Sequence, residues 1–257
     1  MDRLAGKVVI VTGGAGGIGA ATVREMTAQG AKVVIADLDA SAGDELASGL
    51  GESVSFFPMD VSKESDWQNA LDYTLSLHGE VNALVNNAGI HALVGVEDID
   101  AAEVLRMFSI NVLGGMLGVK NIAPAMRKSG HGVIVNVSSV DALRGVNGMS
   151  PYVACKWAVR GVTKAQALEL GPVIRVVSVH PGGTNTGMSR PSGENLNAPY
   201  AKVPMARIGE PSEVAKVIGF VVSDDASYIS GTEIAVDGGW SAGDYYPGIP
   251  GSRDVTI

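Results

Sequence analysis

Apolar residues occur along the chain in two patterns, short continuous runs and longer stretches with helical spacing. The short runs are rich in Val and Ile and nearly unbroken, as in parallel strands buried on both faces. They are 7–12, 32–36, 54–57, 81–86, 132–138, 174–179 and 232–237. The amphipathic stretches between them are 18–29, 41–49, 63–78, 98–127, 151–169 and 211–223. This alternation predicts an α/β fold with a doubly wound parallel sheet.

Two segments fit none of these elements, namely 187–210 and the tail 241–257. No linker, internal repeat or shift in composition divides the chain, so residues 1–257 are predicted to form a single domain. Loops this long in a compact domain are usually functional or mobile. We therefore predict that 187–210 is a substrate loop that closes over a bound ligand and excludes water.

Composition narrows the classes of partner. Charged residues make up 18% of the chain, against about 25% in typical proteins, which favours a homo-oligomer with buried interfaces. The formal net charge of −8 argues against nucleic acid and anionic membranes, which bind basic surfaces. The single cysteine, Cys155, cannot form an internal disulfide, and the first residues resemble neither a signal peptide nor a membrane span. A cytoplasmic location is expected.

A glycine cluster directly follows the first predicted strand and opens the first predicted helix. It reads TGGAGGIG from Thr12 to Gly19. Glycine lets the backbone turn tightly and approach a pyrophosphate, and a helix N-terminus offers free N–H groups. A glycine cluster alone is often an ordinary turn, but between a strand and a helix it predicts a Rossmann-type dinucleotide site. The expected contact residues are Gly13, Gly14, Gly16, Gly17, Ile18 and Gly19.

The second predicted strand leads into an acidic residue, Asp37. Its distance from Gly19 is close to the spacing of about 20 residues at which a carboxylate binds the ribose hydroxyls of a dinucleotide. A carboxylate there would repel the 2′-phosphate of NADP. The nearby Gly16 and Leu38 bring no positive charge to welcome one. The sequence therefore predicts NAD as the cofactor, with Asp37 and Leu38 at the adenosine end.

Further motifs resemble those of the short-chain dehydrogenase/reductases, from about Arg3 to Trp240. The glycine cluster fits the TGxxxGxG pattern of that family, NNAG follows the fourth strand, and VDGG stands near the C-terminus. The resemblance implies a catalytic tetrad formed by Asn111, Ser139, Tyr152 and Lys156. It implies further cofactor contacts at Asp60, Val61, Asn87, Ala88, Gly89, Tyr152, Lys156, Pro181, Gly182, Thr184 and Thr186. The stretches YVACKWAVRGVTK and SVHPG look closest to bacterial 3α,20β-hydroxysteroid dehydrogenases.

The resemblance also implies an assembly, because the family forms tetramers built on paired helices and C-terminal segments. It predicts a homotetramer with 222 symmetry. The helices expected around 98–127 and 151–169 would form one interface. The segment 211–240 would form the other.

Tyr152 and Lys156 are spaced i, i+4, which puts both side chains on one helix face, about 6 Å apart along its axis. A free tyrosine, with a pKa near 10, is a poor base at neutral pH, and the Lys156 ammonium is expected to lower the pKa of the phenol. Ser139 is expected to donate to the reacting oxygen, and Asn111 to hold a water that resupplies protons to Lys156. NAD would carry the hydride.

The predicted substrate is a small-molecule alcohol or ketone with a bulky, mainly apolar ring, such as a steroid. Met149, Met188 and Met205 flank the expected pocket, and the span 187–204 carries few charges. Asp141, two residues after Ser139, faces either the substrate or solvent. The four histidines show no metal-ligand spacing, so no metal is expected.

Two other functions stay open. A 3-oxoacyl-thioester reductase would share the tetrad, but such enzymes generally prefer NADPH and present basic residues to an acidic carrier. Arg127, Lys128 and Arg175 could form such a cluster, whereas Asp37 argues against it. A non-catalytic NAD-binding protein would usually lose the tyrosine or the lysine, and this chain keeps both.

Overall fold

The structure is a computed structural model that describes residues 2–189, 200, 203–246 and 249–250. All seven apolar runs form strands. They are β1 (Val8–Thr12), β2 (Lys32–Asp37), β3 (Val54–Pro58), β4 (Ala83–Asn86), β5 (Gly132–Val137), β6 (Ile174–Pro181) and β7 (Glu233–Val236). Neighbouring strands are parallel throughout, in the order β3-β2-β1-β4-β5-β6-β7. The order reverses between β1 and β4, which confirms the predicted doubly wound sheet.

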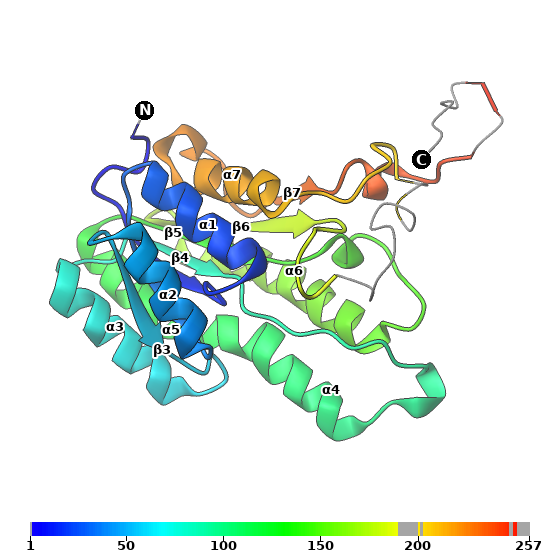
Figure 1. Cartoon of the computed structure of the whole chain (residues 1–257), viewed down its shortest axis with the longest axis horizontal. Coiled ribbons are helices and arrows are strands. Elements are labelled where there is room, and N and C mark those ends of the chain that lie inside the picture. Colours follow the sequence, from blue (N-terminus) through cyan, green and yellow to red (C-terminus); the bar gives the residue numbers. More distant parts are fainter. Residues whose placement is uncertain (1, 190–199, 201–202, 247–248, 251–257) are drawn as a thin grey trace.

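Helices cover both faces of this sheet. They are α1 (Gly17–Ala28), α2 (Ala40–Leu50), α3 (Glu64–His78), α4 (Ala101–Phe108), α5 (Gly114–Ser129), α6 (Ser150–Leu170) and α7 (Pro211–Val222). Figure 1 shows α1 and α7 side by side over one face, and α2 belongs to the same layer. The other face is covered by α3, α5 and α6, and α4 packs against α6.

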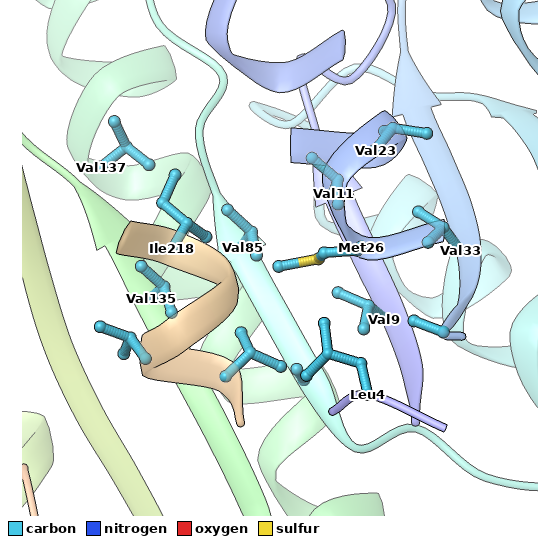
Figure 2. Close-up of a cluster of buried hydrophobic side chains, with 14 of the residues drawn as sticks. Leu4, Val9, Val11, Val23, Met26, Val33, Val85, Val135, Val137 and Ile218 are labelled. Atoms are coloured by element: carbon cyan, nitrogen blue, oxygen red, sulfur yellow. The ribbon is translucent and has the colours of Figure 1, made fainter. Parts of the chain in front are cut away.

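The strands are buried on both faces because their side chains alternate between two separate cores. On one face, Val9, Val85 and Val135 pack against Met26 of α1 and Ile218 of α7 (Figure 2). The intervening strand residues pack on the opposite face under α3 and α5. This second core includes Ile10, Val34, Leu84, Ile134, Trp67, Ile122 and Met126. Burial on both faces explains why the strand sequences are apolar without alternation.

The long helix predicted at 98–127 is a helical run from Ala101 to Ser129 that changes geometry in its middle. Residues Ser109–Leu113 form a π-helical segment between α4 and α5. By length and composition the run could cross a membrane, and its most apolar 18-residue window has a mean hydropathy of 1.3. In this fold its α5 part lies on the sheet, where Ile122 and Met126 are fully buried.

The predicted substrate loop, 187–210, is closed at its base by backbone pairing. Asn185 donates to the Gly209 carbonyl at 2.8 Å, and Gly209 donates to the Gly183 carbonyl at 2.8 Å. The loop therefore leaves and re-enters the fold at one place beside β6. The described residues leave out 190–199 and 201–202 of this loop and 247–248 and 251–257 of the tail. The predicted closure of the loop over a ligand concerns these residues and therefore stays a prediction.

Candidate active site

A cavity of about 640 Å³ opens where the chain leaves the carboxyl ends of β1, β2, β4, β5 and β6. Its size falls within the range of about 300–1,000 Å³ typical of small-ligand sites. Most of the predicted site residues line it. They are Gly13, Gly16, Gly17, Ile18, Asp37, Leu38, Asp60, Val61, Asn87, Ala88, Gly89, Ser139, Tyr152, Lys156, Pro181, Gly182, Thr184 and Thr186. The structure thus gathers residues from the whole length of the chain at the switch point of the sheet.

Gly14 and Gly19 do not line this cavity, although both were predicted as contacts. A Cβ on Gly14 would lie 2.8 Å from the Val11 carbonyl oxygen, and one on Gly19 would lie 2.0 Å from the Gly13 carbonyl oxygen. These two glycines therefore allow the turn to close on itself. Gly13 and Gly17, at φ values of +60° and +53°, supply the left-handed conformations that the turn requires.

The glycine turn is fixed by the segment that follows β4. The Asn87 side chain donates to the carbonyl oxygens of Thr12 and Gly13 at 2.9 and 3.0 Å. The Thr12 hydroxyl accepts in return from the backbone N–H groups of Asn87 and Ala88 at 3.0 and 3.1 Å. Gly16 caps α1 without any side-chain hydrogen bond. The N–H groups of the first helical turn therefore face the cavity without a side-chain cap, as a pyrophosphate site requires.

Asp37 lies at the end of β2 and lines the adenosine end of the cavity. One carboxylate oxygen accepts from the Ala15 N–H at 2.9 Å, and the other accepts from the Asp39 N–H at 3.1 Å. Each oxygen keeps a free acceptor position for a ribose hydroxyl. Among the described lining residues Lys156 is the one lysine or arginine, and it belongs to the opposite end. The residues present therefore fit a dinucleotide.

Lys156 and Asn111 meet at Gly89, on the other side of the cavity. A Cβ on Gly89 would lie 3.1 Å from Asn111 Oδ1 and 3.6 Å from Lys156 Nζ. Lys156 is 4% exposed and donates to the Val137 carbonyl at 3.0 Å. The Asn111 amide is paired at both ends with the backbone of Ile90, at 2.8 Å each. The side chain predicted to hold a water therefore fixes the segment after β4, and the π-helical segment brings it there.

The Tyr152 ring is partly buried next to Lys156, whose Nζ lies 5.5 Å from the ring centre. Burial raises the pKa of Tyr152 to about 12; the Ser139 hydroxyl opposes the rise, and the negative charge of Asp141 adds to it. The predicted lowering of this pKa is wrong for the isolated chain, because the cost of removing the phenolate from water outweighs the favourable contacts. Lys156 is itself buried, which lowers its own pKa to about 8.

Ser139 follows β5 and is held from two sides. Its hydroxyl accepts from the Asp141 N–H at 3.1 Å and donates to the Asp141 carboxylate at 3.3 Å. His180 of β6 is fully buried, with Nδ1 2.9 Å from the Ser139 carbonyl oxygen and Nε2 2.8 Å from the Ser178 hydroxyl. Burial lowers the pKa of His180, so the ring stays neutral.

Several residues on the substrate side were missed by the sequence analysis. His91 lies edge-on to Tyr152, with ring centres 6.0 Å apart, and its Nε2 donates to the Met188 carbonyl at 2.8 Å. Arg144 stacks over Trp240, 4.8 Å from the ring centre, and Trp240 meets Tyr200 edge-on at 5.6 Å. These residues come from separate loops and from the C-terminal segment, so no local motif announces them.

The structure decides between the two predicted positions of Asp141, and it places the three methionines at different sites. Asp141 is half-buried against Ser139 and is not a solvent-exposed turn residue. Met188 lines the main cavity, and Met205 lines a neighbouring one with Tyr200. Met149 caps the start of α6. Within the described part of the chain, no group of three or more His, Cys, Asp or Glu side chains is placed to hold a metal ion.

Comparison with known proteins gives consistent matches over nearly the whole chain. A family model described as "Enoyl-(Acyl carrier protein) reductase" matches residues 13–241. The 3-alpha-(or 20-beta)-hydroxysteroid dehydrogenase of Mycobacterium tuberculosis is 40% identical, over 94% of this chain and 92% of the relative. The trans-4-hydroxycyclohexanecarboxylate dehydrogenase of Sinomonas cyclohexanicum is 39% identical, over 94% and 95%. The crystal structure of a levodione reductase superposes with a TM-score of 0.88 at 33% identity, covering 93% of this chain and 98% of that one.

Proposed function

The chain belongs to the short-chain dehydrogenase/reductase family, and we propose that it is an NAD-dependent dehydrogenase that interconverts cyclic secondary alcohols and ketones. The observation that carries the proposal is one continuous cavity. It joins the glycine turn and Asp37 at one end to Ser139, Tyr152 and Lys156 at the other. This arrangement would bring a bound dinucleotide to the reacting carbon and Tyr152 to the oxygen attached to that carbon.

The choice of NAD over NADP rests on Asp37. Its carboxylate lines the cavity next to the glycine turn, where the adenosine ribose would bind, and Leu38 beside it is apolar and 71% exposed. A 2′-phosphate at this place would face a negative charge, and none of the described lining residues at this end carries a positive charge to balance it. The ribose hydroxyls of NAD would instead donate to Asp37.

Bound NAD supplies the ring that accepts or returns the hydride. The protein contributes the proton transfer, through the Tyr152 phenol, and the Ser139 hydroxyl as a second contact to the reacting oxygen. With its pKa raised to about 12, Tyr152 keeps its proton at neutral pH and is suited to protonating the alkoxide formed on ketone reduction. Alcohol oxidation needs the phenolate and is therefore favoured as pH rises. Lys156 holds its place beside the ring through Val137.

The cyclic substrate is proposed from the relatives and from the walls of the site. The relatives at 40% and 39% identity are named for a hydroxysteroid and a hydroxycyclohexanecarboxylate, which are both ring alcohols. In this chain the aromatic side chain of Tyr200, which belongs to the loop 187–210, meets that of Trp240, and both line the neighbouring cavity. Flat apolar rings of this kind favour a ring-shaped ligand. The loop and the tail 241–257 are proposed to complete the pocket within a single catalytic domain, 1–257.

The alternative of a 3-oxoacyl-thioester reductase has less support, because the basic residues it would need are engaged elsewhere. Arg175 donates to the backbone carbonyls of Ile229, Val221 and Ser223. Arg127 donates to the Glu169 carbonyl at 2.9 Å. These contacts hold the two guanidinium groups to the fold and leave no concentrated patch for an acidic carrier. A non-catalytic role has no support either, because Tyr152 and Lys156 both line the cavity.

The functional form is proposed to be a cytoplasmic homotetramer without nucleic-acid or membrane partners. Large apolar side chains are exposed on the two helices predicted to pair, including Leu105 (66%) on α4 and Leu168 (86%) on α6. Tyr228, in the segment predicted as the second interface, is fully exposed. Apolar surface of this extent favours burial between subunits. Light scattering should give the mass of four chains at micromolar concentration, and a stable monomer would contradict the assembly.

The proposed activity is tested by following NADH formation from NAD⁺ with a panel of alcohols. The panel contains hydroxysteroids, cyclic alcohols, linear polyols and 3-hydroxyacyl thioesters. We expect the two classes of ring alcohol, the hydroxysteroids and the cyclic alcohols, to include the best substrates. Their kcat/KM should be at least about tenfold above those of the linear polyols and the thioesters, as expected when a shaped pocket discriminates by a few contacts. Faster turnover of thioesters or linear polyols would contradict the proposal.

A further inference from the structure

Asp141 is a half-buried carboxylate with an unusually poor supply of hydrogen-bond donors. The Ser139 hydroxyl, at a long 3.3 Å, is the one donor to its side chain among the described residues. Arg144 lies near enough to lower its pKa, but it stacks on Trp240 and makes no ion pair with Asp141 in the described part of the chain. A carboxylate offers about four acceptor positions. Apart from the Ser139 hydroxyl, no described group fills those on Asp141, which lie next to a residue that lines the cavity.

The charged form of a half-buried carboxylate is unfavourable unless a hydrogen-bond donor or a cation contacts it. Burial raises the pKa of Asp141, which means that the charged form is poorly solvated. Its negative charge also opposes ionisation of Tyr152 and Tyr200. If the substrate were apolar away from the reacting carbon, no contact with it would offset either of these two unfavourable effects. A substrate that donates a hydrogen bond to Asp141 removes the first disadvantage and reduces the second.

A second acceptor lies near Tyr152 and is also without a partner. The Nδ1 atom of His91 is buried and makes no hydrogen bond. Because Nε2 of the same ring contacts the Met188 carbonyl, which can only accept, Nε2 carries the proton and Nδ1 of the neutral ring is an acceptor. Two segments, one after β4 and one after β5, thus each bring an acceptor to the tyrosine.

We propose that the substrate is a hydroxylated ring whose second hydroxyl, one or two carbons from the reacting carbon, donates to Asp141. Ser139 has one O–H group and would turn it from Asp141 to the reacting oxygen, at about 2.8 Å. The Asp141 oxygen, 3.3 Å from the Ser139 hydroxyl, then loses this donor and lies within about 6 Å of the reacting oxygen. A hydroxyl on the adjacent or the next ring carbon reaches this position. The inference rests on the proposed dehydrogenase function and replaces the mainly apolar ring expected from the sequence with a cyclic diol or hydroxyketone.

The test compares cyclohexanol with the 1,2- and 1,3-cyclohexanediols as substrates for NAD⁺-dependent oxidation. The enzymes are the unmodified protein, Asp141→Ala, and the control Asp72→Ala, which removes an exposed carboxylate on α3. We expect the unmodified protein and the control to prefer a diol. In Asp141→Ala, kcat/KM for the diol should fall by about 10- to 100-fold, mainly through KM, as for a lost hydrogen bond to a charged group. Asp141 also contacts the Ser139 hydroxyl and alters the pKa of Tyr152, so cyclohexanol turnover can change, but its change should be smaller than the loss for the diol.

Two results would overturn the inference. One is equal use of cyclohexanol and the diols by the unmodified protein, and the other is an equal loss for all substrates in Asp141→Ala. Oxidation of no alcohol at all would contradict the proposed function instead. In that event the inference is tested separately by calorimetry, which measures the binding of the diol and of cyclohexanol to the protein saturated with NADH. Diol binding that is tighter than cyclohexanol binding and weakened in Asp141→Ala supports it, and equal binding of the two overturns it.

Discussion

The two halves of the cavity are built in different ways. The cofactor half consists of backbone turns at the ends of consecutive strands, and hydrogen bonds between Asn87 and the glycine turn hold it together. The substrate half consists of single side chains that converge from separate loops, such as His91, Asp141 and Trp240. The first half presents fixed N–H groups and a carboxylate held by two backbone N–H groups. The second half presents the Asp141 carboxylate, which has one donor among the described residues, and the unpartnered Nδ1 atom of His91.

The cofactor half holds the features that the chain shares with its family. The substrate half holds the features that distinguish it from other members. Backbone turns of one kind can bind one cofactor whatever side chains surround them, because N–H groups and helix ends do the binding. Side chains on loops can be exchanged without disturbing the sheet, so they set the substrate. Substitutions in the cofactor half should therefore alter cofactor use for every substrate. Substitutions in the substrate half should alter the ranking of substrates.

The largest effect is expected where the two halves meet. Tyr152→Phe removes only the phenolic oxygen, and kcat should fall about a thousandfold, as for the loss of a positioned proton-transfer group. The ring remains between Lys156 and His91, so NADH affinity measured by fluorescence titration should be unchanged. Substantial turnover by this variant would show that the proton passes through another group.

A smaller but directional effect is expected in the cofactor half. Asp37→Ala combined with Leu38→Arg should move the ratio of kcat/KM for NAD⁺ and NADP⁺ by about 100-fold toward NADP⁺, because a hydrogen-bonded carboxylate is replaced by a cation. The matched control is Asp44→Ala, which removes an exposed carboxylate on α2. An unchanged ratio in the double variant would show that Asp37 does not determine the choice between NAD⁺ and NADP⁺.

The smallest effect concerns the pH dependence set by the substrate half. Asp141 raises the pKa of both Tyr152 and Lys156 through its charge, so Asp141→Asn should let both groups lose their protons at lower pH. The rising limb of kcat/KM for cyclohexanol oxidation should move to lower pH, since the phenolate forms more readily. Cys155, the other group that raises both pKa values, is unaltered in this variant. A shift to higher pH would contradict the assigned charge.

The cofactor half was predictable because its signals are local. TGGAGGIG stands between a strand and a helix, and Asp37 stands at a strand end, so position in the sequence fixes position in the fold. The continuous Val and Ile runs likewise gave the strands, although β6 extends to Pro181 because its end pairs with β7. Gly14 and Gly19 belong to the motif, but their role is to let the turn close and not to contact the ligand directly.

The substrate half could not be predicted in the same way because its contacts join distant segments. Nothing near Arg144 in the sequence indicates Trp240, and nothing near His91 indicates Met188. The π-helical segment at Asn111 was also missed, since helical spacing does not distinguish one inserted residue. The pKa of Tyr152 depends on burial, which the i, i+4 spacing with Lys156 does not report.

The central claim is that this cavity transfers a hydride from a ring alcohol to NAD⁺ under the control of Tyr152. It is tested most directly with a cyclohexanediol deuterated at its carbinol carbons, by mass spectrometry of the reduced cofactor. The account predicts one deuterium in the NADH formed by the unmodified protein and no labelled cofactor above background with Tyr152→Phe. Unlabelled NADH, or equal labelling by the two proteins, would contradict it.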